Sequence, residues 1–356
     1  MASARIKAFS LGLTTVLIAF IAITMIGELF FRGYYWSRGR TFSNKDHNIV
    51  LTRNIPDTLL GWKPTPFFET TEIRKDAGGN SYEVHYTADK HGFRQYGDIG
   101  TKKIKVLLIG DSFTQANHAS TAETYYTLLQ DSLNWEIFTF GCSGYGTLQE
   151  YLVLDLFMDT IRPDLVLFQY CHNDLINNSF PLERASLWNN NGTRRPYWSE
   201  NGIYYDIPKR FHGLRTFANT HSRLLFFIFN RIDRLKSHFS TESVETKIAE
   251  LGKSFPDYAE SLKVTDEIFQ LIRKRTPSSV PVCIFAADNA PPFYSDVKTV
   301  AQKNGFLFIE GIPEAVALAA KEGKIVHYQD GAHWSPEGHR IVANTLMQYF
   351  RKNPLF

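Results

Sequence analysis

The sequence predicts an α/β fold, a three-layer α/β/α sandwich with a mostly parallel five-stranded sheet, preceded by an N-terminal transmembrane helix. Two observations predict this architecture. From about residue 103 onwards, short apolar runs alternate with longer segments of helical periodicity, and such alternation is typical of a parallel sheet with helices on both faces. Near the N-terminus, residues 9–27 contain no charged side chain, and their length is close to the ~20 residues that a spanning helix needs.

The composition limits the class of protein. The chain has 356 residues, of which 44% are hydrophobic and 21% are charged, so most of it can fold around a core. A net charge of +3 is too small to indicate nucleic-acid binding. The three cysteines form no C-x-x-C pair. They predict neither a disulfide framework nor a zinc site, and we expect no metal and no cofactor.

The apolar segment 9–27 is interpreted as an uncleaved signal anchor. Five aromatic residues follow it within residues 30–36, as in the interfacial belts of membrane proteins. A cleaved signal peptide is the alternative, but its apolar region is usually shorter, and no convincing small-x-small cleavage site is present. The basic residues after the segment favour a cytoplasmic domain, whereas a short basic N-terminus favours an extracytoplasmic one. Because the signal-anchor layout fits the second arrangement, we expect an extracytoplasmic domain on a single-pass anchor.

The chain divides into an anchor, a spacer and one large domain. We expect residues 1–30 to form the anchor, residues 31–102 a juxtamembrane spacer with a small β element, and residues 103–356 the α/β domain. Prolines and a Gly-Gly-Asn run indicate turns in the spacer, and the alternation in residues 81–87 indicates a strand. A long insertion, residues 178–255, interrupts the large domain.

The regular elements of the large domain follow from its apolar periodicity. Strands are predicted at residues 104–109, 136–140, 165–170, 280–286 and 307–309. Helices are predicted at residues 121–133, 147–158, 258–275, 294–303, 313–321 and 336–350. Helix 147–158 is expected to start at Thr147 as the N-cap, with Glu150 at the spacing of a capping box. The last helix has Pro336 at its first position, where proline is favoured.

The insertion has two parts with different patterns. Residues 187–201 are rich in Asn, Arg, Trp and Gly, and we expect a loop there. Residues 214–239 have the pattern of a basic amphipathic helix, with three phenylalanines that widen its apolar side. We expect this helix to pack on the large domain. A lid over the site or a contact with the membrane surface is the alternative.

Polar residues and one glycine stand after the carboxyl ends of the first three strands and before the last helix. They are Asp111 and Ser112 after the first strand, Gly144 after the second, Asn173 after the third, and Asp330 with His333 before the last helix. Because ligands of open α/β sheets bind outside the carboxyl ends of the strands, we expect these residues to share one cleft.

Together these residue types suit nucleophilic catalysis. A carboxylate such as Asp330 can fix the tautomer of a histidine, and the imidazole of His333 can then accept the proton of a serine hydroxyl. Glycines let the backbone approach a ligand closely and present its N–H groups. An asparagine at the end of the third strand can direct an amide into the same cleft.

These residues stand in four short blocks of the sequence, around Ser112, Gly144, Asn173 and the Asp330–His333 pair. The four blocks resemble those of the SGNH hydrolases, the GDSL family of esterases and lipases, and in particular its membrane-anchored bacterial members. The resemblance covers about residues 90–350. It includes Gly110-Asp111-Ser112-Phe113, with Phe113 where leucine is usual. In the third block, Cys171 stands where the family has glycine in Gly-x-Asn-Asp.

The resemblance implies a role for each residue of the site. Ser112 would be the nucleophile, His333 the general base, and Asp330 the residue that orients His333. The backbone N–H groups of Ser112 and Gly144, with the side chain of Asn173, would form the oxyanion hole.

Three functions remain open from the sequence. The first is an anchored serine esterase that hydrolyses an acyl ester, on an O-acetylated glycan or on a lipid. The second is an O-acyltransferase that delivers the acyl group to a cell-envelope glycan, and the third is a non-catalytic membrane scaffold on the same fold. Exposed Trp188, Tyr197 and Trp198 would favour a glycan. A groove lined by the phenylalanines at 226, 227 and 229 would favour a lipid.

Overall fold

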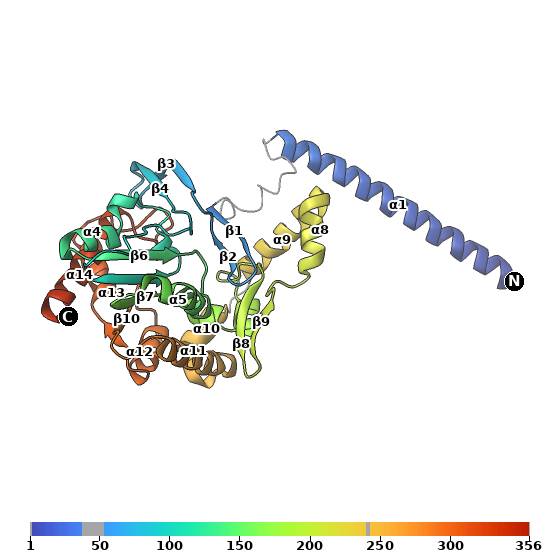
Figure 1. Cartoon of the computed structure of the whole chain (residues 1–356). Coiled ribbons are helices and arrows are strands. Elements are labelled where there is room, and N and C mark those ends of the chain that lie inside the picture. Colours follow the sequence, from blue (N-terminus) through green and yellow to red (C-terminus); the bar gives the residue numbers. More distant parts are fainter. Residues whose placement is uncertain (1, 38–52, 240–242, 356) are drawn as a thin grey trace. The chain divides into compact units, whose positions relative to one another are not determined.

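The computed structural model describes residues 2–37, 53–239 and 243–355 (Figure 1). Residues 38–52 of the predicted spacer and residues 240–242 of the predicted insertion lie outside the described residues. The chain forms two compact units. One combines Met1–Thr52 with Arg210–Thr241, and the other combines Arg53–Lys209 with Glu242–Phe356.

A five-stranded sheet forms the centre of the second unit, in the order β11-β10-β7-β5-β6. Its strands are β5 (Lys105–Gly110), β6 (Glu136–Gly141), β7 (Leu165–Tyr170), β10 (Val282–Ala286) and β11 (Leu307–Ile309). All four pairings are parallel. The predicted α/β fold with five strands is therefore confirmed.

Helices pack on both faces of this sheet (Figure 1). On β5, Val106 and Leu108 pack into a cluster with α4 (Tyr125–Leu133), α13 (Ile312–Lys321) and α14 (Pro336–Lys352). The alternate residues Leu107 and Ile109 pack on the other face, with α5 (Thr147–Ile161), α11 (Pro256–Arg275) and α12 (Phe293–Lys303). Because successive side chains of a strand point to opposite faces, both faces of this interior strand must be apolar.

The predicted N-cap of one helix was wrong, and another predicted helix begins differently. Helix α5 has Gly146 as its N-cap, and Gln149 accepts a hydrogen bond from the Gly146 N–H at 3.3 Å. Thr147 is therefore the first helical residue, and Glu150 points into the interior, where it is 2% exposed. The predicted helix 121–133 begins instead as a 3₁₀ turn, Thr121–Glu123, before α4.

Three antiparallel hairpins accompany the sheet. They are β1 (Asn54–Asp57) with β2 (Gly61–Pro64), β3 (Glu69–Lys75) with β4 (Ser81–Thr87), and β8 (Arg195–Ser199) with β9 (Gly202–Asp206). Strand β4 coincides with the strand predicted in the spacer. Strand β8 lies where we expected a loop, and it buries Tyr197, whose exposure would have favoured a glycan.

Short helices complete the second unit. They are α3 (Ser112–Gln115), α6 (Asn173–Asn177), α7 (Phe180–Ala185) and α10 (Val244–Leu251). Helices α3 and α6 begin directly after β5 and β7, so their first residues stand at the carboxyl edge of the sheet.

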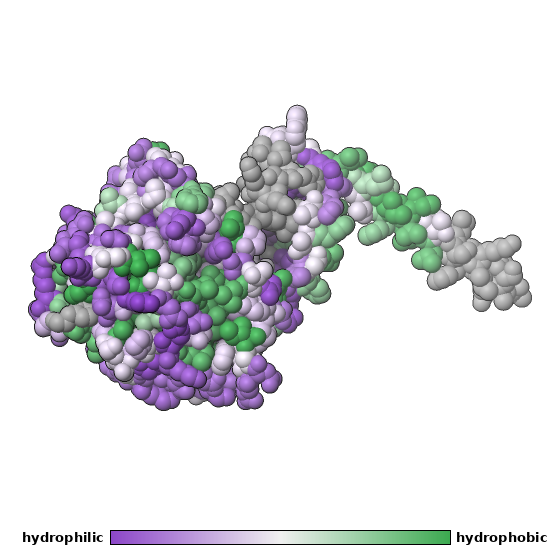
Figure 2. Space-filling model, in the orientation of Figure 1, coloured by the Kyte–Doolittle hydropathy of each residue, from purple (hydrophilic) through white to green (hydrophobic). Residues whose placement is uncertain are grey.

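The first unit contains α1 (Ala2–Ser37), α8 (His212–His221) and α9 (Arg223–Phe239). Within α1, Gly12–Ser37 is long and apolar enough to cross a membrane, and Figure 2 shows this helix as a largely hydrophobic rod. The single helix predicted for residues 214–239 is in fact two helices. They are separated by Ser222, whose extended backbone and Oγ atom cap α9 through a 3.1 Å bond from the N–H of Leu225.

Candidate active site

Ser112, His333 and Asp330 form a continuous hydrogen-bonded chain. The Nε2 atom of His333 lies 2.8 Å from the Oγ atom of Ser112, and its Nδ1 atom lies 2.6 Å from Oδ2 of Asp330. The imidazole is therefore bonded at both nitrogens, to a hydroxyl on one side and to a carboxylate on the other. This is the arrangement in which a histidine can remove a serine proton.

The turn after β5 presents Ser112 at the start of α3. The side chain of Asp111 accepts a 2.9 Å hydrogen bond from the N–H of Phe113 and so caps this helix. A Cβ atom at Gly110 would collide with Thr114 and Gln169, so only glycine fits this turn. Asp111 thus serves the turn.

The loop before α14 holds His333 in place. Asp330 accepts hydrogen bonds from the backbone N–H groups of Ala332 and His333 through Oδ1, while Oδ2 bonds the imidazole. Burial opposes the charge of Asp330, but the bonds from His333 and Ala332 outweigh it and lower the pKa of this carboxyl well below its usual value. Asp330 is therefore a permanently charged partner of the imidazole at neutral pH.

Two aromatic rings flank the imidazole of His333. The ring of Phe113, which stands where the family usually has leucine, lies 4.9 Å from it, and the ring of His118 lies 5.3 Å from it. Burial, together with the charges of His333 and Arg74, lowers the pKa of His118 to about 3. A neutral His118 adds no second positive charge beside the imidazole.

Gly144 lies in a loop whose carbonyl groups accept hydrogen bonds from side chains of other segments. Its φ of +77° is a conformation that favours glycine. The carbonyl of Ser143 accepts a 3.0 Å hydrogen bond from Nε1 of Trp62. Because the C=O and N–H of a trans peptide point in opposite directions, the Gly144 N–H points away from Trp62.

The backbone N–H groups of Ser112 and Gly144 donate no hydrogen bond to any atom of the residues that the structure describes. Both remain available to a ligand. The carbonyl of Gly144 is held separately, by Nη2 of Arg195 at 2.5 Å and by Nδ2 of Asn191 at 3.3 Å. Arg195 is itself buried and paired with Glu183 at 3.0 Å.

Asn173 lies beside the Gly144 loop, and none of its hydrogen bonds to the described residues reaches the triad. Its Nδ2 atom lies 3.3 Å from the carbonyl of Tyr145 and 3.2 Å from Oδ1 of Asn177. The structure thus brings Ser112, Asp330 and His333 into direct contact, and it joins Asn173 to the loop of Gly144.

A second hydrogen-bonded cluster precedes Asn173. Oδ2 of Asp288 lies 3.0 Å from Nδ1 of His172, 3.2 Å from the His172 N–H and 3.1 Å from Sγ of Cys171. Burial opposes the charge on Asp288, yet its bonds to His172 and Cys171 lower its pKa to about 2. The pairing of Asp288 with His172 was not predicted from the sequence, because the two residues are 116 positions apart.

Three buried carboxyl groups lie behind the site, at Asp111, Glu150 and Asp174. Burial raises the pKa of Glu150 well above its ordinary value, and repulsion from Asp111 adds to this effect. The pKa of Asp174 is raised by burial and by repulsion from Glu150 and Asp111. The interior beneath the triad therefore favours protonated carboxyl groups.

Two groups of side chains among the described residues have donor atoms close enough to hold a metal ion. They are His118 with Asp330 and His333, and Cys171 with His172 and Asp288. Hydrogen bonds connect the members of the second group, and they connect Asp330 with His333 in the first. His118 only contacts the ring of His333, and its buried Nδ1 atom has no hydrogen-bond partner among the described residues. Because His333 is also the partner of Ser112, we interpret Asp330 and His333 as part of the triad.

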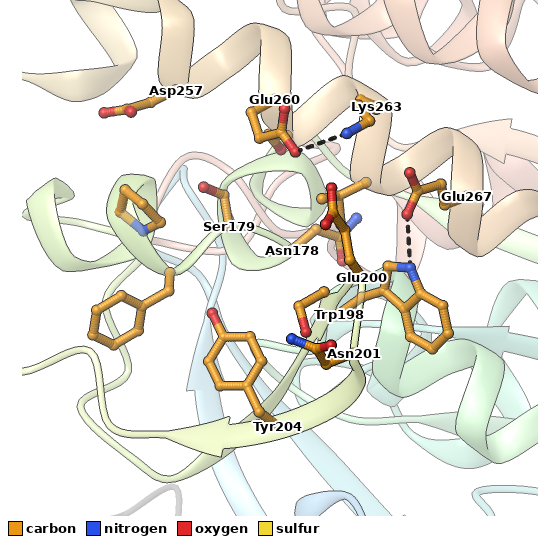
Figure 3. Close-up of a pocket in the computed structure, with 15 residues that line it drawn as sticks. Asn178, Ser179, Trp198, Glu200, Asn201, Tyr204, Asp257, Glu260, Lys263 and Glu267 are labelled. Carbon is orange, nitrogen blue, oxygen red and sulfur yellow. Dashed lines mark hydrogen bonds and ion pairs between the residues drawn. The ribbon is translucent and has the colours of Figure 1, made fainter.

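A pocket of about 390 Å³ lies between the β8–β9 hairpin and the first turns of α7 and α11 (Figure 3). Trp198 lines it and donates a 2.8 Å hydrogen bond from Nε1 to Glu267. Glu200 and Tyr204 stand on the hairpin side, and Glu260 pairs with Lys263 on α11. No triad residue lines this pocket.

Comparisons with known proteins add the family. Residues 108–341 match the GDSL-like lipase/acylhydrolase family. No curated protein matches the chain by sequence. Among solved structures, this chain is similar to TesA, with 13% identity over 71% of this chain and 99% of TesA, at a TM-score of 0.41.

Two further solved structures are similar at low identity. The esterase EstA from Pseudoalteromonas sp. is 12% identical over 70% of this chain and 97% of its own, with a TM-score of 0.37. The acetylxylan esterase Axe2 from Geobacillus stearothermophilus is 16% identical over 70% of this chain and 94% of its own, with a TM-score of 0.34. The family match alone spans more than half of the sequence, and the chain belongs to the GDSL-like lipase/acylhydrolase family, whose members hydrolyse ester bonds.

Proposed function

We propose that this protein is a membrane-anchored serine esterase that works through an acyl-enzyme on Ser112. The observation that carries the proposal is the hydrogen-bonded chain from Ser112 through His333 to Asp330. In the first step, Ser112 Oγ attacks the ester carbonyl carbon while Nε2 of His333 takes the hydroxyl proton. The same proton then passes to the leaving alcohol oxygen as its bond to carbon breaks. Water then attacks the carbonyl carbon of the acyl-enzyme while His333 takes its proton. That proton passes to Ser112 Oγ as its bond to carbon breaks and the acid is released.

The oxyanion hole in this mechanism uses the N–H groups of Ser112 and Gly144 and the amide of Asn173. The support is that both backbone N–H groups have no partner among the described residues, while the carbonyls around them are held by Trp62 and Arg195. A preorganised donor of this kind is typically worth about 3–4 kcal/mol of barrier.

For the substrate, the pocket of Figure 3 favours an O-acetylated glycan over a lipid. Its aromatic side chains Trp198 and Tyr204 stand among hydrogen-bonding groups, and an acyl chain would leave those polar groups unpaired. The phenylalanines that would have lined a lipid groove belong to the first unit. There Phe227 stacks on Phe31 and Phe226 contacts Tyr35.

Transfer of the acyl group to a glycan hydroxyl is the second candidate. In this reaction a sugar hydroxyl takes the place of water, and the polar and aromatic lining of the same pocket suits such a glycan. Hydrolysis and transfer share one intermediate, so only the products separate them. Incubation with an acetyl donor and an envelope oligosaccharide, followed by mass spectrometry, should show loss of acetyl from the glycan for an esterase and gain of acetyl for a transferase.

Anchoring rests on α1, which we propose to span the membrane once with the second unit outside the cytoplasm. The length and apolar composition of Gly12–Ser37 support the span, and the short basic N-terminus supports the orientation. A C-terminal fusion to alkaline phosphatase should be active in cells. Activity of a matched fluorescent fusion in the cytoplasm, with an inactive phosphatase fusion, would reverse the orientation.

The triad is tested by treating the full chain, in detergent, with a fluorophosphonate. Intact mass should rise by one phosphonyl group, peptide mapping should place it on Ser112, and short-chain aryl ester hydrolysis should stop. Ser112→Ala should show neither labelling nor hydrolysis, whereas the control Ser295→Ala, on the exposed start of α12, should behave as wild type. Labelling at another residue, or unchanged hydrolysis by Ser112→Ala, would remove Ser112 from the mechanism.

A further inference from the structure

The helices α8 and α9 pack on one end of α1, and aromatic rings make the contact. The ring of Phe227 stacks on Phe31 with centroids 4.2 Å apart. The ring of Phe226 meets Tyr35 edge-on at 5.6 Å. These partners on α1 lie directly after the uncharged segment 9–27. The hairpin of α8 and α9 is therefore attached where the apolar part of α1 ends.

A polar contact fixes this attachment. The carboxylate of Glu28 accepts hydrogen bonds from the backbone N–H groups of Arg223 and Leu224, both at 3.0 Å, and from the hydroxyl of Ser222 at 2.8 Å. These N–H groups belong to the first turn of α9, where a negative charge is favourable. Arg32 holds the same carboxylate at 2.7 Å and bonds the last carbonyl of α8 at 3.0 Å.

The hairpin keeps an apolar stripe that α1 does not cover. Its members recur at helical spacing on α8 and α9 and are each more than one-third exposed: Leu214, Phe217, Ile228, Ile232 and Leu235. A soluble unit rarely leaves such a row of large side chains in water.

The same hairpin carries an unusual charge. Residues 210–239 contain six Lys and Arg residues against one Asp, a net charge of +5. The other 326 residues contain 33 basic and 35 acidic residues, a net charge of −2. Two of the arginines lie over aromatic rings of the hairpin, Arg215 at 4.7 Å from Phe229 and Arg231 at 5.1 Å from Phe227. Long basic side chains beside an apolar stripe are typical of helices that lie in a membrane interface.

We propose that the α8–α9 hairpin lies in the headgroup layer of the membrane that α1 spans, with its apolar stripe in the acyl boundary and its basic side chains on anionic headgroups. This inference rests on the proposed span of α1. The attachment at Glu28 places the hairpin at the level where the apolar segment gives way to the aromatic residues at 30–36, which is the depth of the headgroups. The positive charge suits the negative surface potential of such a layer.

The test uses the full chain in nanodiscs that contain anionic lipid, with one introduced cysteine per variant carrying an environment-sensitive fluorophore. The three native cysteines are buried and should not react. Phe217→Cys and Ile228→Cys report on the stripe. Their matched controls are Thr216→Cys and Asn230→Cys, which are exposed on the opposite sides of the same helices. Ile18→Cys reports on the span of α1.

Stripe probes should be quenched several-fold more by a nitroxide near the top of the lipid acyl chain than by aqueous iodide, and the control probes should show the reverse. Replacing the anionic lipid by a zwitterionic one should reduce the lipid quenching of the stripe probes. If the Ile18→Cys probe is not quenched by a nitroxide deep in the bilayer, the span itself is wrong. If that probe is quenched but the stripe probes respond to iodide, the hairpin proposal alone falls. Stripe probes shielded from both quenchers would mean that a protein covers the hairpin, which also overturns the proposal.

Discussion

The Nε2 atom of His333 lies 2.8 Å from the Oγ atom of Ser112, although 221 positions separate the two residues in the chain. Ser112 follows the interior strand β5, and His333 lies in the loop that leads into α14. Helix α14 packs against α4 on the face of the sheet that holds Val106 and Leu108. The packing of the last helix thus brings the loop before it over the carboxyl end of β5.

Replacing Asp330 by Asn should nearly abolish esterase activity. The Asn oxygen would keep the bonds from the backbone N–H groups of Ala332 and His333, so its NH₂ group would face Nδ1 of His333 as a donor. The imidazole then loses both its productive tautomer and its counter-charge. We expect kcat for a short-chain aryl ester to fall on the order of 10⁴-fold, with little change in KM. The control Glu310→Gln removes a surface carboxylate that pairs with Lys298 and should leave kcat unchanged. Activity of Asp330→Asn within tenfold of wild type would contradict this role.

Trp62→Phe tests whether the 143–144 peptide is an oxyanion donor. The variant keeps an aromatic ring in the core but loses the Nε1–H that holds the Ser143 carbonyl at 3.0 Å. One neutral hydrogen bond is worth about 1 kcal/mol, so we expect kcat to fall by roughly 5- to 10-fold. Steady-state kinetics should show this loss in kcat with KM nearly constant. Trp188→Phe, at an exposed position, is the matched control; an equal effect in both variants would refute the positioning role.

Asp288→Asn should destabilise the fold most strongly in mildly acidic solution. The pKa of Asp288 is lowered to about 2 from 3.8. The ionised carboxylate therefore contributes fully to folding stability above pH 3.8, and this contribution is lost as the pH falls towards 2. Burial opposes the charge of His172, but the bond to Asp288 outweighs it and raises the pKa above 6.5, so this contribution is lost as the pH rises through the raised value. Urea unfolding should show a loss of about 1–3 kcal/mol. The loss should be largest between about pH 4 and 6.5. A pH-independent difference would rule out a charged pair.

Glu150→Gln should make the protein more resistant to alkaline conditions. Burial and Asp111 raise the pKa of Glu150, so the folded state holds a proton that the unfolded state releases above its ordinary value of 4.5. The wild type must therefore lose stability as the pH rises through this range, by up to about 1.4 kcal/mol per pH unit. Denaturation midpoints from pH 5 to 9 should fall more steeply for the wild type than for Glu150→Gln. The exposed Glu250→Gln should follow the wild type; parallel curves for all three proteins would contradict the prediction.

The sequence predicted the sheet well because each of its strands is an apolar run, and β7 is buried along its whole length. The position of Ser112 at the edge of the sheet could be anticipated for the same reason, whereas His333 and Asp330 follow no strand and their meeting with Ser112 was implied by the family resemblance. Polar residues directly after such runs can only gather at one edge of the sheet. The parallel pairing of β5 with β6 and β7 then sets which residues meet.

The supporting contacts could not be predicted, because they join distant segments without a pattern of their own. Trp62 lies 81 positions before the carbonyl that it holds. Asp288 has no neighbouring histidine in the sequence, yet it bonds His172. The break at Ser222 was not predicted because the apolar pattern resumes after it at helical spacing. Ser222 ends α8 through its backbone N–H and caps α9 through its hydroxyl.

The hairpin β1–β2 has a practical consequence for anyone preparing a soluble form. Trp62 sits on β2, and its backbone carbonyl also accepts a 2.6 Å bond from the hydroxyl of Tyr145. A fragment cut at the first strand of the sheet would keep Ser112, His333 and Asp330 but release the loop that carries Gly144. Expression should therefore begin no later than Arg53, where the unit that contains the sheet starts.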